Sequence, residues 1–490
     1  MLNHPTKRSK GVLIVCCSCA IIVLFVNYKV IILGLFVAFV FLLSRRSQSE
    51  RELPLNLNGQ LIKSSTSKDI EETVVDCEAG CETCVFKEAH MPPPNGSLEF
   101  RRFLMKQPTY FRPDPEELAD ALPKKATNIL LNKIRENGNQ MVIGSLSIKL
   151  ASSFGFCWGV ERSIAIAYLA LKKFSTRKIY LTNELIHNPD VNDVLSSKGI
   201  EFVRKDNKGN RDFSTIKQGD VVILPAFGAP IDEMRTLYNQ GAIIVDSTCP
   251  WVTKVWNVVE KHKKQGITSI IHGSAKHEET EATKSLAVKY LIVRNEEETK
   301  ELCDAIEGKI DPYIFLKERP AHSFSNNLDP MKDLRNIGIA NQTTMLKSQT
   351  EVISHMLRAT MERVNGSFSA MDTICDATQE RQDAIQELVN YGEIDIMIII
   401  GGFNSSNTAH LLEIALQSQN VKHAFHVDKG ERIKLDNSIQ HKLLDSQELT
   451  LTHDFISKGF ITIGITSGAS TPDEVVEDCL SRLITIKEST

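Results

Sequence analysis

Three cysteines occupy equivalent places in this sequence, each between an apolar run typical of a strand and a run with helical spacing. They are Cys157 in "GFCWG", Cys249 in "DSTCPW" and Cys375 in "TICDAT". The N-terminus of a helix lowers the pKa of a thiol placed there, so these positions favour a ligating thiolate over an inert thiol. Because the three residues are too far apart for a local metal knuckle, a shared soft-metal site would have to be assembled from separate units.

A single cysteine at such a position could simply be a capping or core residue, but the repetition favours a shared site. Three thiolates cannot saturate a four-iron cluster, so the fourth iron would stay open for a substrate oxygen, like the open position of a catalytic zinc. Cys303 in "ETKELCDAI" and Cys479 in "VVEDCLSRL" lie within helical apolar patterns instead. We expect these two cysteines in the hydrophobic core.

The elements that would position the cysteines repeat one order from residue 141 onward: a strand, a polar turn and a helix. The stretches "DVVILPAFGAPIDEMRTLYNQG" and "IDIMIIIGGFNSSNTAHLLEIALQ" are two examples. This alternation predicts an α/β fold with mainly parallel sheets. Ligands of such sheets bind where strands end and helices begin, and helix N-termini suit phosphates. Taken one at a time, the polar residues at these turns could also be ordinary helix caps.

Size and charge exclude some classes of protein. The chain has 490 residues, of which 42% are hydrophobic and 24% charged, and this length allows several domains. The net charge is −4 and there is no basic block, so nucleic-acid binding is not indicated and an anionic ligand would be held by local groups. The eleven cysteines are too scattered for a disulfide scaffold.

The first 140 residues differ from the rest. Residues 1–50 have a basic start and two apolar runs within 11–43, which favour a hydrophobic targeting leader; a retained membrane anchor is the alternative. Residues 51–140 show little periodicity and are predicted to be an extension or linker. Within them "CEAGCETC" has the C-x3-C-x2-C spacing of radical S-adenosylmethionine enzymes, but no strand–helix series begins there. We favour chance or a local metal or disulfide site for Cys77, Cys81 and Cys84.

Eight motifs in order give a specific resemblance. They are "GFCWGVERSIAIA", "LIHNP", "DSTCPWVTKV", "KHEETEAT", "NQTTM", "TICDATQERQ", "FNSSNT" and "GASTP". Together they resemble the 4-hydroxy-3-methylbut-2-enyl diphosphate reductases, the LytB-type iron–sulfur family, over about residues 145–485. The resemblance implies three α/β lobes in a trefoil around one central [4Fe–4S] cluster. We place the lobes at residues 141–249, 250–373 and 374–490.

The resemblance also implies an activity and the residues that carry it. The hydroxyl of an allylic diphosphate would be removed with two electrons and two protons, giving isopentenyl and dimethylallyl diphosphates in the last step of the non-mevalonate pathway. Cys157, Cys249 and Cys375 match the cluster ligands. Glu279 matches the proton-delivering acid, with Glu278 and Glu281 as alternatives from sequence, and Thr343 matches the residue that orients the substrate oxygen, with Thr344 as its rival. The residues that match diphosphate contacts are His187, His277, Ser405, Ser406, Asn407 and Ser470.

One departure places the chain closest to the plant and cyanobacterial branch. Bacterial members have an Ala-His-Gly turn with another phosphate-contacting histidine, whereas this chain reads "PAFGAP" with Phe227. That branch implies ferredoxin as the electron donor. With the leader, it implies a plastid or apicoplast location reached in two steps, the alternative being an anchor at residues 11–43. A non-catalytic iron–sulfur sensor would have no need of Glu279, Thr343 and the Ser-Ser-Asn turn together, so we expect an enzyme.

Overall fold

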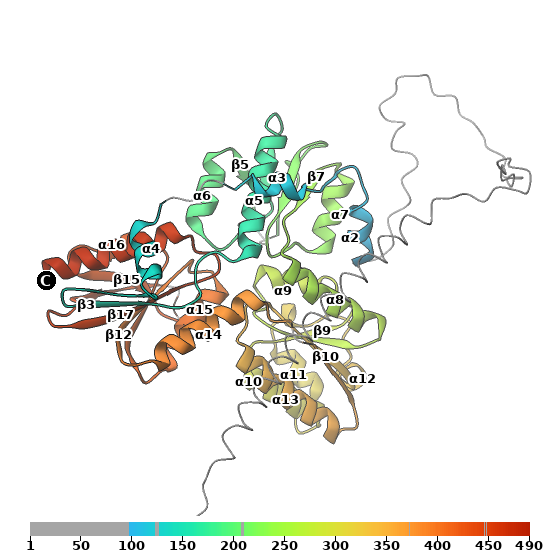
Figure 1. Cartoon of the computed structure of the whole chain (residues 1–490). Coiled ribbons are helices and arrows are strands. Elements are labelled where there is room, and N and C mark those ends of the chain that lie inside the picture. The colour runs from blue at the N-terminus through green and yellow to red at the C-terminus, as the bar shows by residue number, and fades with distance from the viewer. Residues whose placement is uncertain (1–97, 123–126, 207–209, 372, 445, 447) are drawn as a thin grey trace, which may run out of the picture. The chain divides into compact units, whose positions relative to one another are not determined.

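The structure is a computed structural model that describes residues 98–122, 127–206, 210–371, 373–444, 446 and 448–490. The expected leader and the motif with Cys77, Cys81 and Cys84 lie outside these residues. No helix in the described part combines the length and the apolar character that crossing a membrane requires. The described residues belong to one compact unit, His90–Thr490, which contains three β-sheets (Figure 1).

The first sheet has the strand order β1-β7-β6-β4-β5, and all its pairings are parallel. Its strands are β1 (Tyr110–Phe111), β4 (Ile179–Leu181), β5 (Ile200–Phe202), β6 (Val221–Leu224) and β7 (Ile243–Asp246). The helices of this region are α2 (Leu98–Leu104), α3 (Pro115–Ala119), α5 (Trp158–Lys173), α6 (Pro189–Ser197) and α7 (Ile231–Asn239). Strand β6 is buried at every position, as continuous apolar runs in parallel sheets are.

The second sheet is also parallel, with the order β11-β10-β8-β9. Its strands are β8 (Thr268–His272), β9 (Tyr290–Val293), β10 (Asn336–Asn341) and β11 (Ser367–Ala370). The helices of this region are α8 (Pro250–Lys264), α9 (Glu278–Lys284), α10 (Glu296–Ile306), α11 (Pro312–Glu318), the 3-10 helix η2 (Ala321–Ser323), α12 (Pro330–Asp333) and α13 (Lys347–Arg363). Cys303 is 6% exposed in the core beside this sheet, as predicted.

The third sheet has the order β14-β15-β13-β12-β17-β3-β2, with β16 paired to β15. Its strands are β2 (Gln140–Ile143), β3 (Leu146–Leu150), β12 (Ile394–Ile400), β13 (Val421–Val427), β14 (Ile433–Lys434), β15 (Ser438–Lys442), β16 (Leu449–His453) and β17 (Ile461–Ser467). The helices are α4 (Ile129–Glu136), α14 (Asp376–Asn390), α15 (Ser406–Gln417), η3 (Gly430–Arg432) and α16 (Asp473–Ser489). Cys479 is fully buried in its core, again as predicted.

The predicted α/β class with several parallel sheets is confirmed, but two segments differ from expectation. The hairpin β2–β3, which we placed in the first lobe, pairs with β17 of the third sheet (Figure 1). Its inward residues Leu146, Ile148 and Leu150 pack in the core of that sheet, and sequence order alone does not specify which sheet a hairpin joins. The region expected to be irregular up to residue 140 contains α2, β1, α3 and α4, which are short elements held by contacts distant in sequence.

Candidate active site

The three cysteines each occupy the N-cap of a helix. Cys157 precedes α5, Cys249 precedes α8 and Cys375 precedes α14. Cys157 Sγ accepts a hydrogen bond from the backbone N–H of Val160, and Cys375 Sγ accepts one from that of Thr378. The strand–turn–helix reading of the sequence is therefore confirmed at all three positions.

One cavity brings together every site residue that the sequence predicted. Its walls include the three cysteines and the eight other predicted residues, which are His187, His277, Glu279, Thr343, Ser405, Ser406, Asn407 and Ser470. These residues come from all three sheet regions of the chain. The cavity also contains Phe227, Trp251 and Thr378, which were not among the predicted site residues.

The sulfur atoms lie close enough to one another to share a ligand. A Cβ atom on Gly159 would lie 2.7 Å from Cys249 Sγ and 3.8 Å from Cys157 Sγ, so the space between these sulfurs requires glycine. Cys375 lines the same cavity, and a charge on Cys157 would contribute to raising the pKa of Cys375. Three soft donors around one cavity, with a backbone position kept free of side-chain atoms, fit a thiolate-ligated iron–sulfur group.

The protonation state of two of these thiols corrects a sequence-based expectation. Burial raises the pKa of Cys249 to about 11 and that of Cys375 to about 12. The effect of burial is therefore larger than the lowering of both pKa values that we expected from the helix N-termini. Without a metal these groups are neutral thiols at pH 7. A thiolate at either position therefore depends on a bound metal, whose positive charge displaces the proton.

Glu279 is the second residue of α9 and is 1% exposed. Its Oε1 accepts a hydrogen bond of 2.7 Å from the backbone N–H of Thr343, and its Oε2 accepts one of 2.8 Å from the Thr343 hydroxyl. Burial raises the pKa of Glu279 to about 7, although both hydrogen bonds act in the opposite direction. A carboxyl group with this pKa can hold a proton near neutral pH and release it to a bound ligand.

The sequence alternatives to these two residues have other partners. Glu278 Oε1 accepts a hydrogen bond of 2.8 Å from the side chain of Asn183. Glu281 is paired with Lys284 at 2.7 Å, and neither of the two acids lines the cavity. Thr344 does line it, but its hydroxyl accepts a hydrogen bond of 2.7 Å from Gln342. Glu279 and Thr343 are therefore the pair directed into the cavity.

A chain of hydrogen bonds fixes the proton positions of the two histidines. His277 Nδ1 accepts a hydrogen bond from the backbone N–H of Glu279, so the proton of the neutral ring must be on Nε2. That Nε2 lies 3.3 Å from Nε2 of His187, whose Nδ1 in turn lies 3.0 Å from a Glu184 carboxylate oxygen. Burial, helped by the neighbouring His187, lowers the pKa of His277 to about 3. His277 is thus a neutral donor, N–H, facing His187.

The same histidines and Glu278 have ligand atoms within 4.8 Å of one another, a spacing that could suit a metal ion. The tautomer of His277 argues against such a site, because its Nε2 carries the proton and has no lone pair to offer. We therefore assign these side chains to hydrogen bonding.

Phe227 packs directly against this pair. Its ring is stacked on His187 with a centroid distance of 4.2 Å and an interplanar angle of 23°, and it meets His277 edge-on at 5.6 Å. From the sequence we predicted no role for Phe227 beyond the loss of one possible phosphate contact. In the structure it fixes the plane of the His187 ring, a function that only the spatial neighbourhood reveals.

Further donors come from the start of α15 and the turn before α16. Ser405 is the N-cap of α15, and its hydroxyl oxygen accepts a hydrogen bond from the backbone N–H of Thr408. Asn407 Oδ1 accepts the N–H of Ala469, whereas its buried Nδ2 has no protein partner. Ser470 donates to the backbone carbonyl of His187 at 3.3 Å. An unpaired buried amide N–H is costly, so Asn407 Nδ2 is a donor available to a ligand.

The cavity attracts negative charge without basic side chains. None of the described residues that line it is a lysine or an arginine. However, the N-cap residues of five helices, α5, α8, α9, α14 and α15, line the cavity. Helix N-termini supply partial positive charge and free N–H groups. The nearby guanidinium of Arg381 is buried and donates to the carbonyl of Gly155, two residues before Cys157. The arrangement suits an anionic group held by neutral donors.

Comparison with known proteins gives consistent matches. The family model described as "LytB protein" matches residues 148–484. A 4-hydroxy-3-methylbut-2-enyl diphosphate reductase of Prochlorococcus marinus (strain AS9601) is 50% identical over 397 residues, covering 79% of this chain and 98% of the relative. The reductase of the same name from Synechococcus sp. (strain CC9311) is 50% identical over 380 residues, covering 76% and 94%.

A solved structure supports the fold. The E-1-hydroxy-2-methyl-but-2-enyl-4-diphosphate reductase from Plasmodium falciparum aligns with a TM-score of 0.51 at 23% identity, covering 69% of this chain and 87% of that chain.

Proposed function

The chain belongs to the LytB family of 4-hydroxy-3-methylbut-2-enyl diphosphate reductases, and we propose that the cavity described above is where it removes the substrate hydroxyl. The overall reaction consumes two electrons and two protons, breaks the allylic C–O bond and releases water. Its products are isopentenyl and dimethylallyl diphosphates, which places the enzyme at the last step of the non-mevalonate pathway.

The observation that carries the assignment is the convergence of three cysteines from separate units with a protonatable glutamate in one cavity. Cys157, Cys249 and Cys375 would hold one [4Fe–4S] cluster. When bound, the cluster supplies electrons and one iron that can accept a hydroxyl oxygen. Proton delivery and diphosphate binding would be carried out by the side chains around it.

Glu279 would donate the proton, and Thr343 would orient the Glu279 carboxyl group. The carboxyl group of Glu279 is buried and its pKa of about 7 leaves about half of it protonated at neutral pH, so it can protonate the departing hydroxyl. The two hydrogen bonds from Thr343 hold the carboxyl in one orientation. Thr343 Oγ, beside the same cavity, could also contact the substrate oxygen.

The diphosphate would lie among the neutral donors. His187, His277 Nε2–H, Asn407 Nδ2 and the hydroxyls of Ser405, Ser406 and Ser470 line the cavity and would contact the diphosphate. Hydrogen bonds to an anion are stronger than neutral ones, and helix N-termini add favourable charge, so several such donors can replace a lysine or arginine. Diphosphate binding would then replace the hydrogen bond that His277 makes to His187 and the one that the Ser470 hydroxyl donates to the carbonyl of His187.

Ferredoxin is the proposed electron donor. Support comes from the similarity to cyanobacterial relatives and from the "PAFGAP" turn of that branch. Trp158, the residue after Cys157, is 63% exposed, so the protein surface comes within one residue of a cluster ligand. An anaerobic reductase assay with reduced ferredoxin tests this choice, with dithionite as the protein-free donor. Turnover with dithionite but not with ferredoxin would exclude that partner.

The proposed location is a plastid or apicoplast, reached through the N-terminal leader, with an anchor at residues 11–43 as the alternative. A fluorescent reporter fused to residues 1–140 tests it. Signal inside the plastid is expected, and a cytosolic or plasma-membrane signal would exclude the plastid.

The activity itself is tested by reconstituting the chain with iron and sulfide without oxygen and supplying the allylic diphosphate. We expect formation of both isopentenyl and dimethylallyl diphosphates. A fully loaded enzyme that leaves the substrate unchanged with every reductant would overturn the proposed function.

A further inference from the structure

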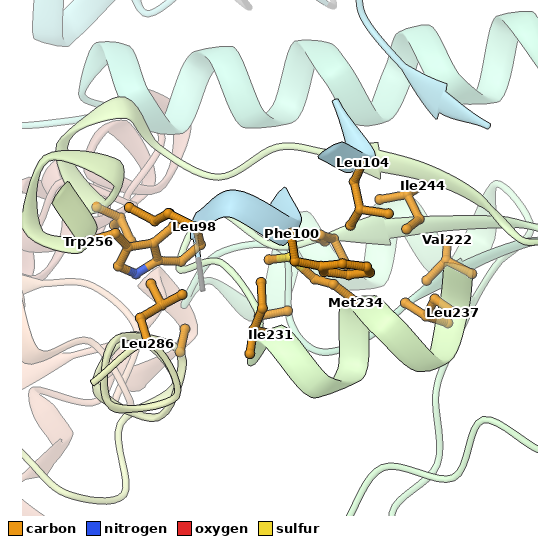
Figure 2. Packing of buried hydrophobic residues seen from close by; sticks show 14 of the residues in the cluster. Leu98, Phe100, Leu104, Val222, Ile231, Met234, Leu237, Ile244, Trp256 and Leu286 are labelled. Carbon is orange, nitrogen blue, oxygen red and sulfur yellow. The ribbon is translucent and has the colours of Figure 1, made fainter. Parts of the chain in front are cut away.

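The segment that precedes the family match is part of the folded enzyme. The family model begins at residue 148, yet α2 and β1 lie before it and are built into the first sheet region. Leu98, Phe100 and Leu104 of α2 are at most 3% exposed and pack against residues of α7, such as Ile231 and Met234 (Figure 2). Strand β1 forms a parallel edge beside β7.

Two polar side chains of this segment converge on Asp246, the last residue of β7. Arg101 donates to Asp246 Oδ2 from Nε at 3.1 Å and from Nη2 at 2.8 Å. The hydroxyl of Tyr110 donates to the same oxygen at 2.6 Å. The Asp246 side chain is only 2% exposed. Although burial raises the pKa of Asp246, Arg101 and the hydrogen bonds lower it to about 2, so the carboxylate is charged at pH 7.

The other carboxylate oxygen holds the loop that ends at Cys249. Asp246 Oδ1 accepts the backbone N–H of Thr248 at 2.9 Å, one residue before the cysteine. The N–H of Cys249 itself donates to the carbonyl of Ala226 at 2.9 Å. The backbone direction at Cys249 therefore depends on a carboxylate whose orientation is set by Arg101 and Tyr110.

A second contact of Arg101 reaches the helix that begins after Cys249. Its guanidinium lies 5.3 Å from the ring centroid of Trp256, which is 1% exposed on α8, the helix that Cys249 caps. The Trp256 ring lies so close to Gly228 that a Cβ there would be 2.3 Å from it, and Gly228 follows Phe227. Gly228 also has a φ of +81°, a conformation that favours glycine.

We propose that Arg101, Tyr110 and Asp246 form a clamp by which the segment before the family match positions Cys249 for cluster binding. The three are positioning residues, since they act through the backbone of the 246–249 loop and touch no reacting atom. This inference rests on the proposed function in taking Cys249 as a cluster ligand. It gives the segment 98–111 a role in the reductase itself.

The test compares Arg101→Met and Tyr110→Phe with wild type in the full-length holoenzyme. Arg319→Met is the matched control, because Arg319 also pairs with a carboxylate, Glu298 at 2.7 Å, and lies 5.2 Å from the ring centroid of Phe315. None of these three residues lines the cavity that contains the cysteines. Loss of a group that orients a metal ligand typically weakens metal binding by about tenfold or more, so Arg101→Met should lose its cluster to an iron chelator about tenfold faster. The midpoint potential and the electron paramagnetic resonance signal should shift as well.

Residue-resolved alkylation, measured by mass spectrometry after iron removal, separates positioning from general destabilisation. In Arg101→Met, Cys249 should react faster than in wild type, while Cys375 and the core residues Cys303 and Cys479 should react as before. Arg101→Lys keeps the charge and should restore part of the protection. Tyr110→Phe, which removes one hydrogen bond, should show the same pattern to a smaller extent even if Arg101→Met does not fold.

Equal acceleration at all cysteines, or unchanged Cys249 reactivity with an unchanged cluster signal, would overturn the clamp. Failure of the proposed function is distinguishable, because it would show as a wild-type chain that binds no cluster. The alkylation of Cys249 would still decide the clamp in that case.

Discussion

Glu279 and Thr343 follow different strands of the second sheet, yet the carboxylate of one is held by two hydrogen bonds from the other. The backbone N–H and the hydroxyl of Thr343 reach the two carboxylate oxygens at 2.7 and 2.8 Å. Because strands β8 and β10 are parallel neighbours, the turns that follow them meet at one edge of the sheet. Among the described residues that line the cavity, Glu279 is the one acid, and this pairing fixes its orientation.

Replacing Glu279 by Gln should leave the cluster spectrum unchanged and lower turnover at least about 100-fold, since a general acid contributes that much or more. The amide keeps the shape of the side chain but cannot release a proton. Glu281→Gln is the matched control on the same helix, because Glu281 is paired with Lys284 outside the cavity, and it should keep nearly full activity. Steady-state kinetics beside absorbance spectra measure both effects, and an active Glu279→Gln enzyme would remove the proton-donor role.

The pH profile should follow the protonation of Glu279. Because burial raises its pKa to about 7, the carboxyl group holds its proton below that pH and loses it above. If the protonated form reacts, kcat/KM should be level on the acid side and fall tenfold per pH unit above about pH 7. The bound diphosphate should move the corresponding limb of kcat to higher pH, since a nearby anion disfavours the carboxylate. A kcat/KM that rises with pH through this range would contradict the assignment.

Thr343→Val removes the hydroxyl but keeps the backbone N–H that holds Glu279. We expect kcat to fall by about tenfold or more, in line with the loss of one hydrogen bond to a charged group. The alkaline limb of the pH profile should move upward, because the hydroxyl stabilises the carboxylate. Thr344→Val is the control, as its hydroxyl bonds Gln342. Equal effects of the two substitutions would show that Thr343 has no special role.

Phe227→Ala should raise KM for the diphosphate several-fold, to about tenfold, with a smaller change in kcat. The stacked ring keeps His187 in one plane, and ordering a side chain in advance lowers the cost of binding. Phe227→His retains a flat ring at this position and should preserve KM. A KM that is unchanged in Phe227→Ala would mean that His187 is held by Glu184 and His277 alone.

The sequence was sufficient for the residues that lie at strand–helix turns. Cys157, Cys249 and Cys375 were placed correctly because the repeating pattern fixes where helices begin, and that is also where ligands collect in α/β sheets. The choice between Glu279 and its neighbours came from the resemblance. Helical spacing alone could not decide it, because the orientation of a side chain in the first turn depends on packing.

Long-range relationships were not predictable. The clamp joins Arg101 to Asp246, and the stack of Phe227 on His187 joins two separate turns. Short elements such as β1 have no periodic pattern of their own, since a two-residue strand exists only through its partner. The thiol pKa values were also misjudged, because burial depends on the complete cavity whereas the helix dipole can be read locally.

The central claim is that three distant cysteines hold one cluster, and iron analysis with Mössbauer spectroscopy on anaerobically reconstituted protein tests it most directly. Wild type should bind about four irons per chain, one of them with a distinct, non-thiolate environment. Serine in place of Cys157, Cys249 or Cys375 should sharply weaken or abolish the cluster, whereas Cys303→Ala and Cys81→Ala should retain it. A wild-type chain without a cluster, or a full cluster in any of the three serine variants, would contradict the account.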